Sequence, residues 1–208
     1  MAMLMIIFAF VLLITLISIV FLLNFYRDPK RAIPEGNNIV SPADGRVISI
    51  IDTSDEEIKI NKGFLGKIRT LAKDVADECY VVSIFMSPFD AHINRAPIDG
   101  IVKSARHEKG HFYKAYDLKK SFENEKNEIV IEDKKNKIKV KVIQIAGFLA
   151  RRIICYVKPG EKVNKGGKVG MIALGSQATF IMPKNKVKLA VKKGDKVKAG
   201  SSIISYIS

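Results

Sequence analysis

The chain has 208 residues, with 35 lysines and arginines against 21 aspartates and glutamates, which gives a formal net charge of +14. This length fits one domain with a real core, and the basic balance favours a partner such as anionic lipid or nucleic acid. The two cysteines, Cys79 and Cys155, lie in apolar runs without the spacing of a zinc site. A disulfide framework and a cysteine metal cluster are therefore excluded, and both thiols are expected to be reduced core residues.

Residues 1–23 predict a membrane anchor. They contain no charge, and Thr15 and Ser18 are their only hydroxyl side chains. A helix rises about 1.5 Å per residue, so this segment is long enough to cross a hydrocarbon layer of about 30 Å. A secretory signal peptide and a core helix are the alternatives. The signal peptide would need a basic start and a small-residue cleavage site, which this segment lacks.

Basic residues follow the apolar segment at positions 27, 30 and 31, and none precedes it. Positively charged flanks stay on the cytoplasmic side, so residues 24–208 are expected at the cytoplasmic face of the cell membrane. Phe25 and Tyr26 lie where an interfacial aromatic belt is expected.

Residues 24–38 predict a linker, with prolines at 29 and 34, and residues 39–208 predict the functional domain. Its first elements are a strand at 39–40, a turn at 41–45, a strand at 47–51, a helix or loop within 63–76, and a buried strand at 79–86. Residues 137–145 alternate between lysines and apolar residues. This alternation predicts a strand with one face in water.

A weak internal repeat occupies the last quarter of the chain. Residues 157–166 and 191–201 both read as a strand, a Gly-Asp/Glu turn, Lys-Val and a second glycine turn. The predicted fold is mainly β (α+β), a small barrel or sandwich that resembles lipoyl and biotinyl carrier domains, preceded by the transmembrane helix. Carrier domains need a lysine at a hairpin tip, and the nearest approach, Lys184 after Met182-Pro183, does not match that pattern.

Asp90 and His92 are the first candidates for chemistry. They stand two residues apart after a buried strand, so both side chains are able to point the same way. A carboxylate beside an imidazole is typical of a general base. The alternative is a loop histidine that binds backbone groups. His107 and His111 have the spacing of a metal pair, but Gly110 between them argues against a helix that would bring them together.

Gly175 and Ser176 follow an apolar strand and form the second candidate. Glycine lets the backbone bend, so that the Ser176 hydroxyl is able to attack the Gly175 carbonyl and convert the amide into an ester. Elimination would leave dehydroalanine, which hydrolyses to a pyruvoyl group. The alternative is an ordinary turn or bulge.

Six ordered segments together carry a resemblance to a known family. They are Phe-Tyr-Arg-Asp-Pro-Lys-Arg at 25–31, Ser-Pro-Ala-Asp-Gly-Arg-Val at 41–47, Ser-Pro-Phe-Asp-Ala-His-Ile-Asn-Arg-Ala-Pro at 87–97, Glu-Asn-Glu-Lys-Asn at 123–127, Gln-Ile-Ala-Gly through Cys-Tyr-Val over 144–157, and Leu-Gly-Ser at 174–176. In these the chain resembles the phosphatidylserine decarboxylases, specifically their short, single-anchor class from bacteria and archaea.

This resemblance implies a proenzyme that cuts itself into a β chain, 1–175, and an α chain, 176–208, which remain together as a heterodimer. Ser176 becomes a pyruvoyl cofactor that forms a Schiff base with the serine headgroup and accepts electrons when CO₂ leaves, so that neither pyridoxal phosphate nor a metal is needed. The implied partners are an aminophospholipid and an anionic membrane, without nucleic acid. Higher oligomers remain open, as does the choice between ester-linked phosphatidylserine and ether-linked archaetidylserine.

The resemblance also implies residue roles. His92 corresponds to the family's catalytic histidine, and Asp44 and Asp90 to carboxylates that support self-cleavage. Longer relatives carry a second histidine where this chain has Arg95, so His92 is expected to serve both steps. Arg151 and Arg152 are candidates for binding the lipid phosphate, because arginine suits bidentate phosphate contacts, or are simply solvated.

Two other classes of protein fit parts of the sequence. A membrane-anchored lipoyl-like binding module would explain the anchor and the repeated turns, and it would leave Ser176 without a role. A basic membrane-surface or nucleic-acid-binding protein would show steep salt dependence and no cleavage.

Overall fold

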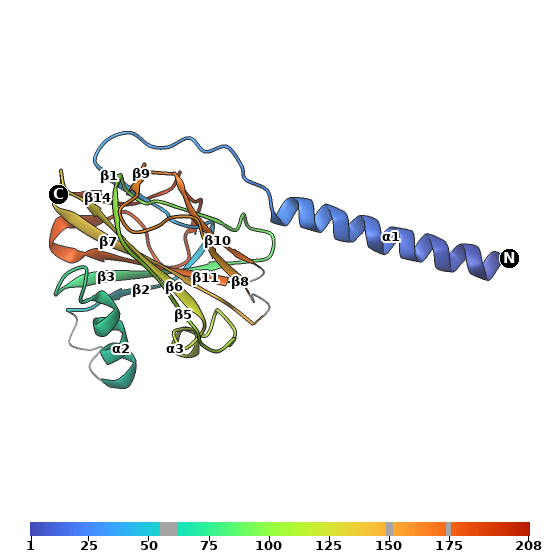
Figure 1. Cartoon of the computed structure of the whole chain (residues 1–208). Coiled ribbons are helices and arrows are strands. Elements are labelled where there is room, and N and C mark those ends of the chain that lie inside the picture. Colours follow the sequence, from blue (N-terminus) through green and yellow to red (C-terminus); the bar gives the residue numbers. More distant parts are fainter. Residues whose placement is uncertain (55–61, 149–151, 174–175) are drawn as a thin grey trace.

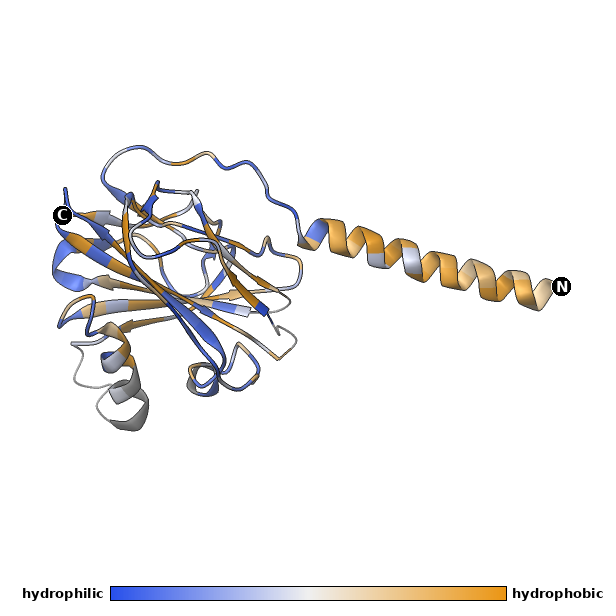
Figure 2. Ribbon diagram, viewed as in Figure 1, coloured by the Kyte–Doolittle hydropathy of each residue, from blue (hydrophilic) through white to orange (hydrophobic). Residues whose placement is uncertain are grey.

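A computed structural model describes residues 1–54, 62–148, 152–173 and 176–208. A long helix, α1 (Ala2–Phe25), projects from one side of a mainly β domain (Figure 1). Its side chains are apolar along almost its whole length (Figure 2) and exposed up to its last turn. The predicted N-terminal helix is confirmed, and it is the one helix of the described residues that is long and apolar enough to cross a membrane.

The largest sheet of the described residues is antiparallel and curls into a half-barrel (Figure 1). Its strands lie in the order β13-β2-β3-β11-β7-β6-β5-β9. Their bounds are β2 (Gly45–Asp52), β3 (Cys79–Met86), β5 (Gly100–Glu108), β6 (Lys126–Asp133), β7 (Ile138–Ile145), β9 (Lys162–Val163), β11 (Ser176–Pro183) and β13 (Lys196–Val197). The mainly β prediction is therefore confirmed, and so are the strands predicted around 47–51 and 79–86.

Two three-stranded sheets cover the inner face of the half-barrel. One is β1 (Asn38–Val40), β14 (Ile203–Ile207) and β12 (Val187–Leu189), and the other is β4 (Ile93–Arg95), β10 (Lys168–Ala173) and β8 (Arg152–Cys155). Alternate residues of β3, such as Val82 and Ile84, pack with Ile39 and Ile172 of the small sheets in the main core. Two short turns of helix, α3 (Leu118–Ser121) and η2 (Lys184–Lys186), connect strands.

Helix α2 (Lys62–Ala72) packs on the outer face of the large sheet, where Ile68 meets Val81 and Ile143. The ambiguous segment 63–76 is thus largely helical. The predicted water-facing side of the strand at 137–145 is wrong at Lys141, which is 2% exposed. Because α2 covers this face, the Lys141 ammonium is buried and binds the Leu71 carbonyl, Glu128 and Asp74 at 2.6–3.0 Å.

The two cysteines are free thiols. Cys79 is fully buried, as predicted. The prediction of a core residue is wrong for Cys155, which is exposed because β8 forms the edge of its small sheet.

The internal repeat corresponds to a repeated structure. Pro-Ala-Asp-Gly at 42–45 leads into β2, and Pro-Ile-Asp-Gly at 97–100 leads into β5. Gly194 N donates to the Val47 carbonyl, and Gly160 N donates to the Val102 carbonyl, both at 2.8 Å. The two small sheets, with the turns beside them, therefore repeat one another.

Candidate active site

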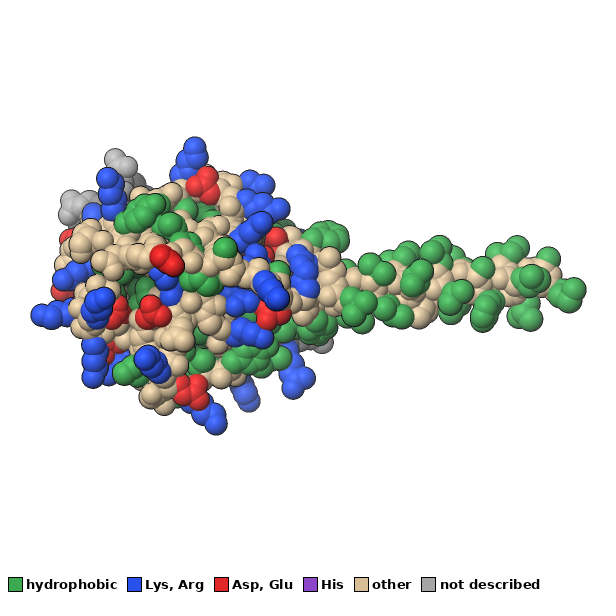
Figure 3. All heavy atoms as spheres, turned by 90° about the horizontal axis from the view of Figure 1, so that it is seen from above, with side chains coloured by type: hydrophobic (Ala, Val, Ile, Leu, Met, Phe, Trp, Pro, Cys, Tyr) green, Lys and Arg blue, Asp and Glu red, His purple; other side chains and the backbone are tan. Residues whose placement is uncertain are grey.

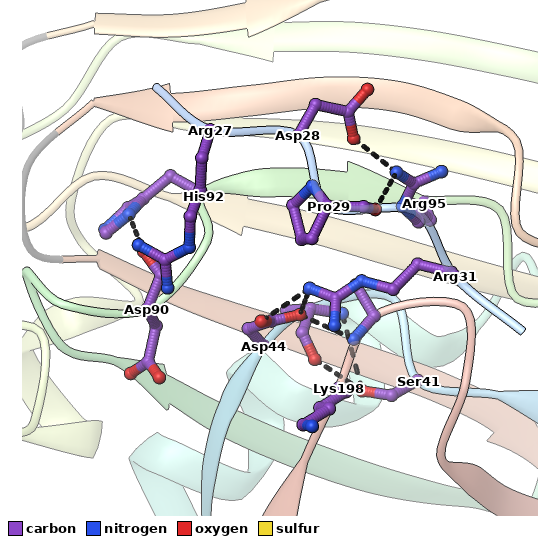
Figure 4. Close-up of polar contacts among 12 residues, drawn as sticks. Arg27, Asp28, Pro29, Arg31, Ser41, Asp44, Asp90, His92, Arg95 and Lys198 are labelled. Carbon is purple, nitrogen blue, oxygen red and sulfur yellow. Dashed lines mark hydrogen bonds and ion pairs between the residues drawn. The ribbon is translucent and has the colours of Figure 1, made fainter. Parts of the chain in front are cut away.

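His92 lies in the loop between β3 and β4 and is fully buried. Its Nδ1 lies 2.8 Å from the carbonyl oxygen of Asp90 (Figure 4). A carbonyl only accepts, so Nδ1 carries the proton and Nε2 holds a free lone pair. Nε2 is buried without a hydrogen-bond partner among the described residues. An unpartnered buried nitrogen is costly, which marks it as a site for a group that arrives later.

Phe25, the last residue of α1, covers the imidazole. The two ring centroids are 4.1 Å apart, and Phe25 also packs on Ile93 and Met171. Of the two aromatic residues expected at the membrane interface, Tyr26 is exposed and Phe25 is turned inward. The apolar anchor therefore ends directly on the candidate catalytic histidine.

Burial lowers the pKa of His92 to about 4, because a charged imidazolium is poorly solvated there. The Asp90 carbonyl and the charges of Asp90 and Asp44 raise this pKa, whereas the Arg27 guanidinium lowers it, and burial outweighs the sum. The ring is therefore neutral at pH 7, and its Nε2 is available to accept a proton.

Asp90 supports His92 through its backbone rather than its carboxylate. Its carboxylate accepts hydrogen bonds from Ser87 N at 2.8 Å and from Ser87 Oγ at 2.7 Å. The expectation that both side chains point the same way assumed an extended strand, but residues 87–90 form a turn closed by the Asp90 N to Ser87 O bond. In Figure 4 the carboxylate points away from the imidazole.

Asp44 is tied to the segment that follows the anchor. Its two carboxylate oxygens accept hydrogen bonds from Arg31 Nη2 at 2.8 and 2.7 Å, and one of them also accepts from Ala199 N at 2.7 Å (Figure 4). Both charged side chains are largely buried. Arg31 is a partner that the sequence reading missed, because the sequence pattern assigned Arg31 a place in the topology and in the resemblance but no partner in the domain.

Ser176 begins β11 and is fully buried opposite Met86 of β3. Its Oγ lies 3.5 Å from the Met86 Sδ, a weak acceptor. Gly175, the other half of the predicted cleavage site, lies outside the described residues. The Ser176 hydroxyl thus has no strong acceptor among the described residues.

A chain of buried amides runs beside this site. Gln144 Nε2 donates to Asn94 Oδ1 at 2.9 Å, and Asn127 Nδ2 donates to Gln144 Oε1 at 2.8 Å. Asn94 Nδ2 also lies 3.9 Å from the Met86 sulfur that Ser176 contacts. The sequence reading missed these roles; the available signal was a polar residue at a buried position of an apolar strand.

Arg95, the residue expected to replace a second histidine, faces away from His92 (Figure 4). Its guanidinium binds the Asp28 carboxylate and donates to the Gly166 carbonyl at 2.8 Å. Arg95 therefore fastens the segment after the anchor to the domain. Of the two candidate phosphate ligands, Arg152 is exposed at the start of β8, and Arg151 lies outside the described residues.

Comparison with known proteins agrees with this arrangement. The family model described as phosphatidylserine decarboxylase matches residues 19–205. The match includes the end of the anchor, the His92 loop and Ser176.

Similar proteins occur in archaea and bacteria. The chain is 43% identical over 188 residues to the "Putative archaetidylserine decarboxylase proenzyme" of Methanocaldococcus jannaschii, covering 90% of each chain. It is 39% identical to the phosphatidylserine decarboxylase proenzymes of Chlorobium limicola, over 93% of this chain and 82% of the relative, and of Geotalea uraniireducens, over 96% and 83%.

Proposed function

The chain belongs to the phosphatidylserine decarboxylase family, and on this premise we propose that Ser176 and His92 carry out both its self-cleavage and its decarboxylation. The protein is a carboxy-lyase made as a proenzyme, and it decarboxylates a phospholipid headgroup. The substrate is phosphatidylserine or archaetidylserine, and the product is the corresponding ethanolamine lipid. The observation that carries the residue assignment is that two buried groups have spare hydrogen-bonding capacity: His92 Nε2 has no partner among the described residues, and Ser176 Oγ has only the weak Met86 contact.

Self-cleavage would start with attack of Ser176 Oγ on the Gly175 carbonyl, which turns the peptide bond into an ester. His92 is the base that removes a proton in this step or in the elimination that follows. Elimination releases the Gly175 carboxylate and leaves dehydroalanine, and one water then replaces the nitrogen as ammonia. The weak Met86 contact leaves the hydroxyl free to move toward the carbonyl.

The position of Ser176 fits the pyruvoyl group that this cleavage would leave at the start of the α chain. It is buried at the beginning of a central strand, next to a sulfur and an amide rather than a charge. When present, that group supplies a carbonyl that accepts the electrons left by departing CO₂. No metal or pyridoxal phosphate is required for this chemistry.

The other candidate residues have supporting roles in this proposal. Asp90 fixes the protonated Nδ1 of His92 through its carbonyl oxygen, so that Nε2 accepts and returns the proton. Asp44 holds Arg31 and contributes negative charge near His92. Arg152, with Arg151, is assigned to the lipid phosphate on the ground of its exposure and its place at the start of β8.

The repeated small sheets support a core of the lipoyl or biotinyl carrier type. A carrier role itself is not favoured, because the ammonium of Lys184 binds Asp52 at 2.7 Å and Ser54 at 2.6 Å instead of standing free. The anchor helix and the basic residues after it support attachment to the cytoplasmic face of the membrane.

The intact mass of the purified chain, measured beside Ser176→Ala, tests the proposal. We expect two fragments that meet at Gly175, with the smaller piece, 176–208, starting in pyruvoyl instead of serine. The Ser176→Ala protein should remain one chain. A wild-type protein that stays uncut, with the mass of its full sequence, would reject the assignment of Ser176.

A further inference from the structure

The large exposed apolar side chains of the β domain, as far as the structure describes it, are all aromatic. Outside α1, every strongly exposed large apolar side chain of the described residues is aromatic: Tyr26, Phe89, Tyr113, Tyr116, Phe148, Tyr156 and Tyr206. Phe89 is 74% exposed and Phe148 is 64% exposed. Phenylalanine at such exposure is costly in water and is typical of a contact surface.

The strand register places Phe89 and Phe148 at one edge of the large sheet. Met86, the end of β3, pairs with Ser176, and Ile145, the end of β7, pairs with the next residue of β11. Phe89 and Phe148 each follow three residues after these strand ends. Since β3 and β7 flank β11 at a spacing of about 4.8 Å per strand, the two phenylalanines leave the sheet close together, on either side of Ser176.

Two tyrosines from another segment join the same edge. The Asn124 amide donates to the Tyr113 carbonyl at 2.8 Å and to the Ala146 carbonyl at 2.6 Å, which ties the backbone of Tyr113 to Ala146, two residues before Phe148. The Tyr116 ring lies 6.4 Å from that of Phe85, the neighbour of Met86.

The anchor leaves the domain at this edge. Arg27, two residues after α1, donates a hydrogen bond to the Phe89 carbonyl at 2.7 Å, and Tyr26 is exposed beside it. In Figure 1 the loop after β3 lies on the side from which α1 projects. We call Tyr26, Phe89, Tyr113, Tyr116 and Phe148 the aromatic rim.

Positive charges accompany the rim. The Lys114 and Lys120 ammonium groups each lie 5.9 Å from the ring centre of a rim tyrosine, and Arg27 lies behind Phe89. Lysine and arginine side chains lie on the domain surface around the place where the apolar helix joins it (Figure 3). Aromatic rings together with cations match the headgroup layer of an anionic bilayer.

We propose that the aromatic rim is a membrane-contact surface that lies against the headgroup layer of the bilayer crossed by α1. The occupant is lipid rather than a second protein, because the rim continues directly from the end of the anchor. This inference rests on the proposed function in one respect: it makes the Ser176 edge open toward the membrane, so that a lipid headgroup arrives without leaving its leaflet.

Tryptophan fluorescence tests this, because the native chain contains no tryptophan. The full chain carrying Phe89→Trp or Phe148→Trp is placed in vesicles of phosphatidylcholine and phosphatidylglycerol, with or without bromine high on the acyl chains. The matched control is Tyr206→Trp, because Tyr206 is exposed on β14, in the sheet formed by β1, β14 and β12, and is not part of the rim. We expect blue-shifted emission and loss of intensity with brominated lipid at positions 89 and 148, and neither at 206.

Equal and unquenched emission from all three variants would overturn the proposal. So would emission at position 89 that shifts with protein concentration in detergent and is untouched by brominated lipid, because the rim would then contact a second copy. The fluorescence measurement does not require the enzyme to turn over substrate. Quenching in a chain that never cleaves rejects the proposed function alone, whereas cleaved protein without quenching rejects only the membrane contact.

Discussion

The two small sheets repeat one another in strand order but differ in what they carry. In each, a short strand is followed by a Pro-x-Asp-Gly turn that leads into a long strand of the large sheet. A hairpin glycine, Gly194 or Gly160, then donates its backbone N–H to a carbonyl of that long strand. Asp44 accepts a hydrogen bond from Ala199 N at 2.7 Å, and Asp99 accepts one from Lys165 N at 2.8 Å. In both copies, therefore, the aspartate of the Pro-x-Asp-Gly turn binds a backbone amide of a later turn, which is a structural role that needs no catalysis.

The two copies differ in the candidate catalytic residues and in what those residues contact. Asp44 has Arg31 as an ion-pair partner and is buried, whereas Asp99 is exposed. His92 stands five residues before the proline of its turn, where the other copy has the exposed Asn37. Comparing the copies thus separates residues needed for the fold from residues needed for the reaction.

Gly45→Ala and Gly100→Ala should have the largest effect, and in both copies. An added Cβ would lie 2.1 Å from the Phe85 carbonyl oxygen at position 45 and 2.5 Å from that of Glu132 at position 100. Because the obstacle is backbone of a paired strand, we expect a loss of about 3 kcal/mol or more in the free energy of unfolding. Chemical unfolding in detergent, in the uncleaved Ser176→Ala background, measures it.

Gly66→Ala is the matched control, since it lies in α2 with nothing within 4 Å of an added Cβ. It should leave stability unchanged or raise it by up to about 1 kcal/mol. If only one of Gly45→Ala and Gly100→Ala lost stability, the two turns would not contribute equally to stability, although their structures repeat.

His92→Asn gives its position the same residue as the other copy and should remove a pH dependence. The folded-state pKa of about 4 lies below the ordinary value of 6.5, so the unfolded chain binds the proton first as pH falls. Stability from the neutral ring is complete above pH 6.5 and is lost as pH falls toward 4, in total about 3 kcal/mol.

In unfolding curves at several pH values, again without cleavage, the slope of stability against pH should differ between the two proteins only within this window, and the stability that wild type has lost should stay lost below pH 4. In the cleavable background, His92→Asn should also lose decarboxylation. A variant with the wild-type pH profile would contradict the buried neutral imidazole, and full activity would contradict its role as base.

Asp44→Asn and Asp99→Asn sharpen the comparison at the turn. The asparagine oxygen still accepts from the turn amide in both, but at position 44 the buried Arg31 loses its counter-ion. We expect a loss of about 2 kcal/mol and slower self-cleavage for Asp44→Asn. Asp99→Asn should change stability by less than about 0.5 kcal/mol and leave cleavage intact. Equal effects would assign Asp44 to the turn alone.

Much of the fold was predictable because its signals are local. The charge-free anchor, the apolar run of β3 and the glycine turns depend on neighbouring residues. The burial of Lys141 depends on α2, which comes more than sixty residues earlier, and no local pattern encodes that contact.

The site was predictable in its residue types but not in its contacts. Ser176 and His92 were found through motifs. The Asp90 carbonyl as partner of His92 comes from a local turn that the sequence reading took for an extended strand. The packing of Phe25 on His92 and the ion pair of Arg31 with Asp44 arise from tertiary packing. A sequence pattern reports which side chains are present, whereas the last two contacts depend on where the end of α1 and the segment after it lie against the domain.

Gly160→Ala and Gly194→Ala should have the smallest effect, and an equal one. The backbone angle φ is +91° at Gly160 and +99° at Gly194, and nothing lies within 4 Å of an added Cβ at either. The only cost is therefore that of an L-residue in a left-handed conformation, about 1 kcal/mol at each position. Unfolding midpoints in the uncleaved background should shift together, and cleavage of the cleavable forms should continue. A much larger loss of unfolding free energy for Gly160→Ala than for Gly194→Ala would mean that the copy bearing His92 tolerates less backbone distortion than the other copy. The requirements of catalysis would then extend to the hairpin turn at Gly160, far from His92 along the chain.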